Sequence, residues 1–176
     1  PWRYDRNCPA RDQEGRRSMR SMASLLFFCA ALGADAAHAF TFRDGSTMQC
    51  IVGGVAIAEE VPPPGDTFYA MPRTGQAVRT ADGYRILWNE QRLRGLPAEV
   101  HDFIFFHECA HVRLATENEL EANCGGLQDM RAAGRAGPAV EARVRAMFGP
   151  ANQFWADTFA CADRGAAQPP AGKAAG

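Results

Sequence analysis

One helical segment constrains this chain more than any other feature of its sequence. Residues 103–106 read FIFF and lead directly into HECAH at residues 107–111. Pro97 and Glu99 suit the start of a helix. Apolar residues then recur at helical spacing, namely Val100, Phe103, Ile104, Phe106, Ala110 and Leu114. Because the FIFF run is apolar nearly all round, we expect a central helix that is buried on most sides.

Two hairpins are predicted before this helix and three further helices after it. Residues 40–52 and 76–89 place β-favouring residues around Asp44-Gly45 and Asp82-Gly83, where glycine supplies the positive φ of a turn. The later helices are expected near residues 117–133, 138–148 and 152–162. The fold class is therefore α+β, with a small antiparallel β region of hairpins followed by a mostly helical half.

The first 39 residues are expected to be upstream sequence and an export signal. A basic stretch from Arg16 precedes an apolar run at residues 23–32 and small residues that end in Ala37-His38-Ala39. Signal peptidase recognises this order, so we expect cleavage after Ala39, and the apolar run is too short for a permanent membrane span. Residues 40–164 would form one exported domain, periplasmic or secreted. Residues 165–176 are small and rich in alanine and proline, which predicts a disordered tail.

The charge of the chain argues against two classes of partner. The formal net charge is -1, and it becomes about -3 when the expected leader is removed. Binding to nucleic acid or to an anionic membrane surface uses clusters of basic residues, which displace counterions. The sequence has no such cluster after the leader, so we expect no nucleic-acid partner.

Four cysteines remain after the expected leader, and an exported chain can oxidise them. We favour the pairing of Cys109 with Cys124, which would tie two consecutive helices together. Cys50 would then pair with Cys161 and join the ends of the domain. The alternative is four free buried thiols, since cysteine is common in apolar cores.

Two histidines four residues apart, His107 and His111, lie on one face of the central helix and can present two imidazoles to one metal ion. Glu108 lies beside the first of them, near the place of a bound water. A catalytic zinc ion needs a third protein ligand and an open fourth position, from which an acidified water attacks. Three glutamates follow on the next helix and could supply the ligand, namely Glu117, Glu119 and Glu121.

The faces of the second helix favour Glu119 as that ligand. Glu119 and Asn123 begin a stripe that continues to apolar Leu127 and Met130, so Glu119 should point inward. Glu117 and Glu121 share another face and are expected to be solvated. Asn123, one turn below Glu119, could hold a ligand histidine through its amide oxygen.

These residues together resemble the gluzincin zinc metallopeptidases, whose pattern is HExxH followed on a later helix by ExxxD. HECAH matches at residues 107–111, and ELEAN matches at residues 119–123 with asparagine in the aspartate place. Small peptidases that cleave phage-type repressors carry a similar E-x-E-A-N. The resemblance covers about residues 84–130. It implies a zinc cofactor, a peptide or protein substrate, and an edge strand before the HExxH helix that pairs with the substrate, here Arg85, Ile86, Leu87, Trp88 and Asn89.

The remaining polar and aromatic residues carry weaker predictions. Four side chains are candidates for stabilising an oxyanion, namely Tyr69, Tyr84, His101 and Arg113. Four aromatic residues are expected in the core rather than in a substrate site, namely Trp88, Phe154, Trp155 and Phe159.

The sequence thus predicts an exported zinc hydrolase, in the first place a metallopeptidase with Glu108 as general base. Two other hypotheses remain open. One is an exported binding or structural module in which zinc serves as a staple, and the other is a disulfide-stabilised domain without a metal.

Overall fold

The structure is a computed structural model that describes residues 38–149 and 151–166. All of the described residues belong to one compact unit. The predicted export signal up to residue 37 and the predicted tail from residue 167 lie outside the described residues. Within them the fold is α+β, as predicted, with short strand hairpins in the first half and helices in the second.

The first predicted hairpin is two hairpins. Strands β1 (Phe40–Thr41) and β2 (Thr47–Met48) pair around Gly45, whose φ of 82° requires glycine. The chain then turns again, so that β3 (Ile51–Val52) pairs with β4 (Val55–Ala56) around Gly53 and Gly54. Each pairing is antiparallel and joins two strands of two residues.

The second predicted hairpin is confirmed, but a further strand changes the topology around it. Strand β6 (Gly75–Thr80) pairs antiparallel with β7 (Gly83–Trp88). Strand β5 (Ala58–Glu60) pairs parallel with the other side of β7, which gives the order β5-β7-β6. A parallel pair needs a crossover connection. A loop with three consecutive prolines, residues 62–64, and a short 3-10 helix (Thr67–Ala70) form part of that connection.

This order corrects the expected substrate strand. Arg85, Ile86 and Leu87 are paired on both sides, Trp88 pairs with Gly75, and Asn89 is the N-cap of helix α1 (Glu90–Arg94). None of these five residues lies on a free sheet edge beside α2. Strand β6 has a free edge instead, because β5 occupies the other side of β7.

The helices follow the predictions within two residues at their starts. Helix α2 is Ala98–Leu114 with Pro97 as its N-cap, and α4 is Pro138–Phe148. Helix α3 is Glu119–Ala132, because the Asn118 side chain accepts from the backbone N–H groups of the first turn and sets its start. Helix α5 is Gln153–Ala166, so residues 165 and 166 are helical rather than part of a tail. No helix in residues 38–149 and 151–166 has the length and apolarity needed to cross a membrane.

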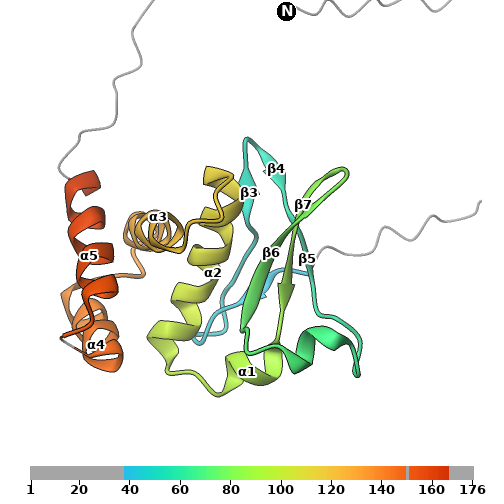
Figure 1. Ribbon diagram of the computed structural model, residues 1–176, viewed down its shortest axis with the longest axis horizontal. Coiled ribbons are helices and arrows are strands. Elements are labelled where there is room, and N and C mark those ends of the chain that lie inside the picture. Colours follow the sequence, from blue (N-terminus) through green and yellow to red (C-terminus); the bar gives the residue numbers. More distant parts are fainter. Residues whose placement is uncertain (1–37, 150, 167–176) are drawn as a thin grey trace, which may run out of the picture. The chain divides into compact units, whose positions relative to one another are not determined.

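Helix α2 is the centre of the fold, with the β6–β7 sheet on one side and α3 on the other, and α5 packs beyond α3 (Figure 1). The FIFF run explains this position, since Phe103, Phe105 and Phe106 are buried on different sides of the helix. Three of the four aromatic residues predicted for the core are there, namely Trp88, Trp155 and Phe159. Phe154 is 42% exposed instead, on the outer face of α5.

The described residues contain two disulfides, and their connectivity differs from the predicted pairing. Cys50 is bonded to Cys109, and Cys124 is bonded to Cys161. Residues two apart in a helix point about 200° away from each other. His107 lies against Gly126 of α3, so Cys109, two residues after His107, faces away from α3 and toward the β region, where Cys50 lies. Cys124 lies two residues before Gly126, which faces α2, and so it points toward α5.

Each disulfide closes a long loop, with sequence separations of 59 and 37 residues. Replacing both cysteines of either pair by alanine should lower the free energy of unfolding by about 4 kcal/mol or less, because loop-closure entropy returns to the unfolded chain. Denaturant unfolding of the two double variants measures this loss. Peptide mapping without reduction should recover the two observed pairs. A peptide that links Cys109 with Cys124 would contradict the connectivity.

Candidate metal centre

Three side chains predicted as metal ligands meet in the structure. His107 and His111 lie one turn apart on α2, and Glu119 is the first residue of α3. The Nε2 atoms of the two histidines are 3.1 Å apart, and one oxygen of Glu119 lies 3.3 Å and 3.6 Å from them. These three donor atoms lie within 4.8 Å of one another and could hold one metal ion.

A tight connection between α2 and α3 brings Glu119 back to the histidines. Ala115 ends α2 in the left-handed conformation, with a φ of 49°. The chain reverses there, and the carbonyl of Thr116 accepts a hydrogen bond from His111 Nδ1 at 2.8 Å. The proton on Nδ1 leaves the lone pair of Nε2 free to bind a metal ion. We call His107, His111 and Glu119 together the metal group. The turn therefore fixes both the tautomer of one ligand and the start of the helix that carries another.

Glu119 differs from its prediction in burial. Its side chain is 65% exposed, and it approaches the histidines from the solvent side of the site rather than from the apolar face of α3. The reason is that α3 begins at Glu119, so its first residue lies at the rim, above the packed turns that follow. Glu117 and Glu121 are exposed, as predicted, and Glu121 accepts a hydrogen bond from Thr116 instead of facing the histidines.

The two helices approach closely at a glycine. A Cβ added at Gly126 would lie 2.9 Å from both Cα and N of His107 and 3.0 Å from the carbonyl carbon of Phe106. These are backbone atoms of α2, which cannot move aside without moving the helix. Gly126 therefore sets the distance between the helix with the histidines and the helix with Glu119.

The electrostatics of the site favour a positive charge at His107. Burial alone lowers the pKa of His107, but the hydrogen bond that His107 donates to Glu119 and the charges of Glu108 and Glu119 raise it above its usual value. His107 Nδ1 is buried without a hydrogen bond of normal geometry among the described residues, although Asn123 lies near enough to raise the pKa of His107. The hydrogen bond that its carboxylate accepts from His107 holds the pKa of Glu119 below its usual value. A metal cation would replace the proton that these groups attract.

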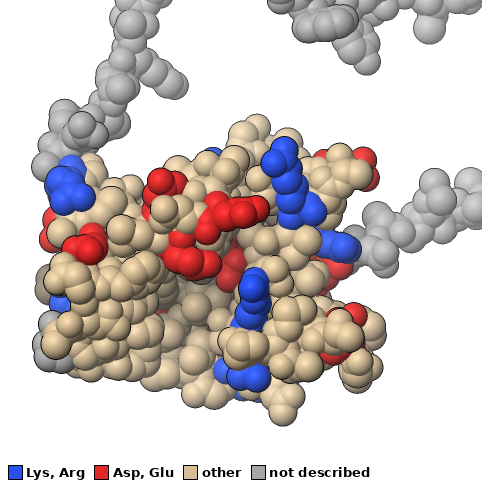
Figure 2. Space-filling model, viewed as in Figure 1, with Lys and Arg blue, Asp and Glu red and all other residues tan. Residues whose placement is uncertain are grey.

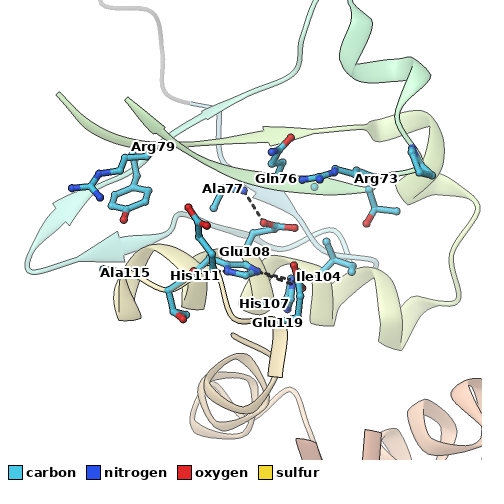
Figure 3. A pocket seen from close by; sticks show the side chains of 16 residues that line it. Arg73, Gln76, Ala77, Arg79, Ile104, His107, Glu108, His111, Ala115 and Glu119 are labelled. Carbon is cyan, nitrogen blue, oxygen red and sulfur yellow. Dashed lines mark hydrogen bonds and ion pairs between the residues drawn. The ribbon is translucent and has the colours of Figure 1, made fainter. Parts of the chain in front are cut away.

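Glu108 is 6% exposed, and its carboxylate accepts a hydrogen bond from the backbone N–H of Ala77 at 2.7 Å. Burial raises its pKa above the usual value, against the opposing charge of His107 and the hydrogen bond from Ala77. Gly75 leaves room for it, since a Cβ there would lie 2.9 Å from Cγ of Glu108 and 2.7 Å from the Trp88 ring. The carboxylate is thus held between the metal group and strand β6 (Figure 3).

The Ala77 hydrogen bond also defines which backbone groups of β6 are free. Along an antiparallel edge strand, alternate residues direct their N–H and C=O groups away from the partner strand. Ala77 donates to Glu108, on the side away from β7, so Gly75 and Arg79 present their backbone groups on the same edge. The free edge of the sheet therefore runs past Glu108.

The metal group opens into a cleft of about 860 Å³ between β6 and the α2–α3 connection. Arg73 lies toward one end of it and Arg79 toward the other, with the histidines and Glu108 between them (Figure 3). Acidic side chains gather near the C-terminal end of α2, and basic side chains lie on the sheet side of the hollow (Figure 2). The cleft could admit an extended chain along the strand edge.

The sequence identified the metal group but not the whole cleft. Of the four oxyanion candidates, only Tyr84 lines the cleft. The other three make hydrogen bonds elsewhere: Tyr69 with Pro62, His101 with Asp102, and Arg113 with Asp129.

The chain matches no protein-family model, no curated protein and no solved structure. Gly75 and Ala77 were missed as site residues. The hairpin predicted over residues 76–89 placed Ala77 on a strand but left out Gly75, and it did not show which strand was at the edge.

Proposed function

We propose that this protein is an exported zinc-dependent hydrolase that acts on peptides, with the gluzincin-like arrangement that its sequence suggests. One observation carries the proposal: a buried carboxylate, Glu108, lies between a group of metal-binding side chains and a free strand edge. A structural metal site has no need of a buried acid beside it, and burying that acid is costly.

The donor set suits zinc. Two imidazole nitrogens and one carboxylate oxygen are common zinc ligands, and three protein ligands leave a fourth position open for chemistry. A bound zinc ion would lower the pKa of a coordinated water to about 7 and polarise a carbonyl group. His107, His111 and Glu119 would hold the ion, and Thr116 orients the His111 ring through its Nδ1.

Glu108 is placed to move protons in this reaction. Glu108 follows the ligand His107 in the chain, and the hydrogen bond from the Ala77 N–H holds its carboxylate in position. It would accept a proton from the attacking water and pass that proton to the amine that leaves. A side chain of this kind contributes about 10²–10⁴-fold to the rate of such reactions.

Strand β6 would hold the substrate. An extended peptide can add to a free sheet edge through backbone hydrogen bonds, and Gly75 and Arg79 present such groups along the cleft, on either side of the Ala77 N–H that donates to Glu108. Ala77 is the residue of β6 that is hydrogen-bonded to Glu108, so the peptide bond to be cleaved would lie near Ala77. Export is supported by the two disulfides, which form in oxidising compartments.

Metal analysis and a peptide-library assay on the oxidised protein test this proposal together. We expect one zinc ion per chain, hydrolysis of unstructured peptides, loss of hydrolysis with a chelator, and recovery when zinc is restored. His107→Ala should lose the metal, because it removes one of three ligands. His101→Ala, on the same helix but outside the metal group, is the matched control and should keep the metal.

Two outcomes would contradict the proposal in different ways. Absence of a metal from both the unmodified protein and His101→Ala would leave a disulfide-stabilised domain. One zinc ion per chain with no hydrolysis of any library member would favour a non-catalytic module in which the metal is a staple.

A further inference from the structure

Two side chains at one end of the cleft have no part in the proposed reaction, namely those of Arg79 on β6 and Tyr84 on β7. The two residues are direct neighbours, because the β6–β7 register pairs Arg79 with Tyr84. Residues directly opposite each other in an antiparallel pair lie on the same face of the sheet, with Cβ atoms about 4.5–5.5 Å apart. A guanidinium and a phenol hydroxyl therefore share one face at this end of the cleft.

That face is the one turned toward helix α2. A Cβ added at Gly75 would lie 2.9 Å from Cγ of Glu108, so this side of β6 faces the helix. Alternate residues of a strand share a face, so Ala77 and Arg79 face the same way as Gly75. Arg79 lies at the opposite end of the cleft from Arg73, with Glu108 and the metal group between them (Figure 3). The two donors thus face the path of a substrate along β6.

The protein itself engages neither donor. Among the described residues, the Arg79 guanidinium makes no ion pair, and neither it nor the Tyr84 hydroxyl makes a hydrogen bond. Most other arginines in that part of the chain are bound, as Arg131 is to Glu141 and Asp163. Arg79 is exposed and Tyr84 is half-buried, so both are accessible to a group that enters the cleft.

The register of a substrate on β6 sets which of its residues lies against Arg79. The peptide would bond to the backbone of Gly75 and Arg79, with the cleaved bond near Ala77. The substrate residue opposite Arg79 then lies two places from the one opposite Ala77, and its side chain lies on the same face as the Arg79 side chain. One substrate side chain close to the cleaved bond is therefore placed against the two donors.

We propose, resting on the proposed function, that Arg79 and Tyr84 form a subsite for a carboxylate of the substrate, two places from the residue opposite Ala77. A guanidinium binds a carboxylate through two parallel hydrogen bonds, and the phenol supplies a further O–H donor. The substrate class is thus an acidic peptide. The carboxylate is that of an aspartate or glutamate side chain or that of the peptide's own C-terminus, since both present the same two oxygens.

The opposite wall of the cleft supports this selectivity. Glu117 and Glu119 line it, on the α2–α3 side. Glu119 would bind the metal, whereas Glu117 stays an exposed anion that repels a second carboxylate on its side. A substrate carboxylate is accordingly favoured on the sheet side, at Arg79.

A series of amidated peptides, in which one glutamate is moved through the positions around the cleaved bond, tests the subsite on the oxidised protein. Each glutamate peptide is compared with the peptide that carries glutamine at the same place. We expect kcat/KM to be higher by about tenfold for glutamate at one fixed position, within about three residues of the cleaved bond. Arg79→Gln should reduce this ratio to about twofold or less.

Arg73→Gln is the matched control, because it removes the same charge from an exposed arginine at the other end of the cleft. It should leave the ratio at the preferred position unchanged. An equal fall of the ratio in Arg79→Gln and Arg73→Gln would show a general attraction of negative charge to the cleft and would exclude the subsite.

A second series, in which peptides end at each of these positions with a free or an amidated C-terminus, tests the other source of the carboxylate. A preference of about tenfold for the free acid, lost in Arg79→Gln, would assign the subsite to the end of the peptide chain. Ratios near one in both series would overturn the proposal.

Tyr84→Phe tests the second donor. It should lower kcat/KM by about three- to tenfold for the preferred peptide, and leave that of its uncharged counterpart unchanged. A loss of kcat shared by both peptides would place Tyr84 at the reacting carbonyl and would overturn its part in the subsite.

A binding measurement separates this proposal from the proposed function. In Glu108→Gln, which should hold peptides without cleaving them, fluorescence anisotropy compares the affinities of the labelled preferred peptide and its uncharged counterpart. We expect a difference of about tenfold, which should disappear when Arg79→Gln is added. If the unmodified protein cleaves neither peptide but this difference is found, the proposed reaction fails and the subsite stands. Cleavage of both peptides with equal affinities would leave the hydrolase and exclude the subsite.

Discussion

Glu108→Gln is expected to retain the metal and to lower the rate of peptide hydrolysis by about 10²–10⁴-fold. The amide has the size of the carboxylate, and its oxygen can still accept the hydrogen bond from Ala77, so the local packing should persist. It cannot accept a proton from water near neutral pH. Metal content by elemental analysis and rates on the best library peptide measure the two parts of this result.

The matched control is Glu117→Gln, which removes an exposed carboxylate from the wall of the same cleft. It should leave both the metal content and the rate close to those of the unmodified protein. If Glu108→Gln hydrolysed the peptide as fast as the unmodified protein, Glu108 would have no part in proton transfer. If it lost the metal as well, Glu108 would have to act on the ligands rather than on the substrate.

Gly126→Ala is expected to weaken metal binding by about 10–100-fold, the range observed when the support of a metal ligand is lost. The added methyl group would meet the backbone of α2 at 2.9 Å, so α3 must move outward and carry Glu119 with it. The free energy of unfolding should also fall by about 1–3 kcal/mol, the usual effect of overpacking. Competition with a chromophoric chelator measures the affinity, and denaturant unfolding measures the stability.

Gly125→Ala, at the neighbouring position, provides the control. A Cβ there would meet the ends of the Arg113 and Leu114 side chains, which can rotate away. Alanine also favours a helix over glycine by about 1 kcal/mol, so this variant should be at least as stable as the unmodified protein. Equal metal affinities for the two variants would show that the helix spacing at Gly126 does not control the position of Glu119.

The sequence predicted the parts of the site that depend on local geometry. His107 and His111 share a face because a helix repeats every 3.6 residues. The stripe on the next helix singled out Glu119, although it predicted an inward side chain and the side chain is exposed. The fold class and the helices from Pro97 onward could be read in the same way, because capping residues and apolar spacing act within one element.

The remaining features depend on how the elements pack, which spacing alone does not determine. Cys109 and Cys124 are close in sequence, yet each points to an element that is far away in the chain. The free edge belongs to β6 rather than β7 because β5 arrives from upstream, a parallel pairing without a local signal. The exposure of Glu119 follows from the cap at Asn118, one residue before it.

The two disulfides divide the described chain into two cross-linked halves. Cys50–Cys109 lies within the part that ends with α2, and Cys124–Cys161 lies within the part that begins with α3. No disulfide spans the boundary in the described residues, yet the metal group does, with two ligands on one side and Glu119 on the other. An ion bound there would cross-link the two halves. Its removal should allow them to part at the Gly126 contact while each half stays intact, and amide hydrogen exchange would show this as faster exchange along the α2–α3 boundary.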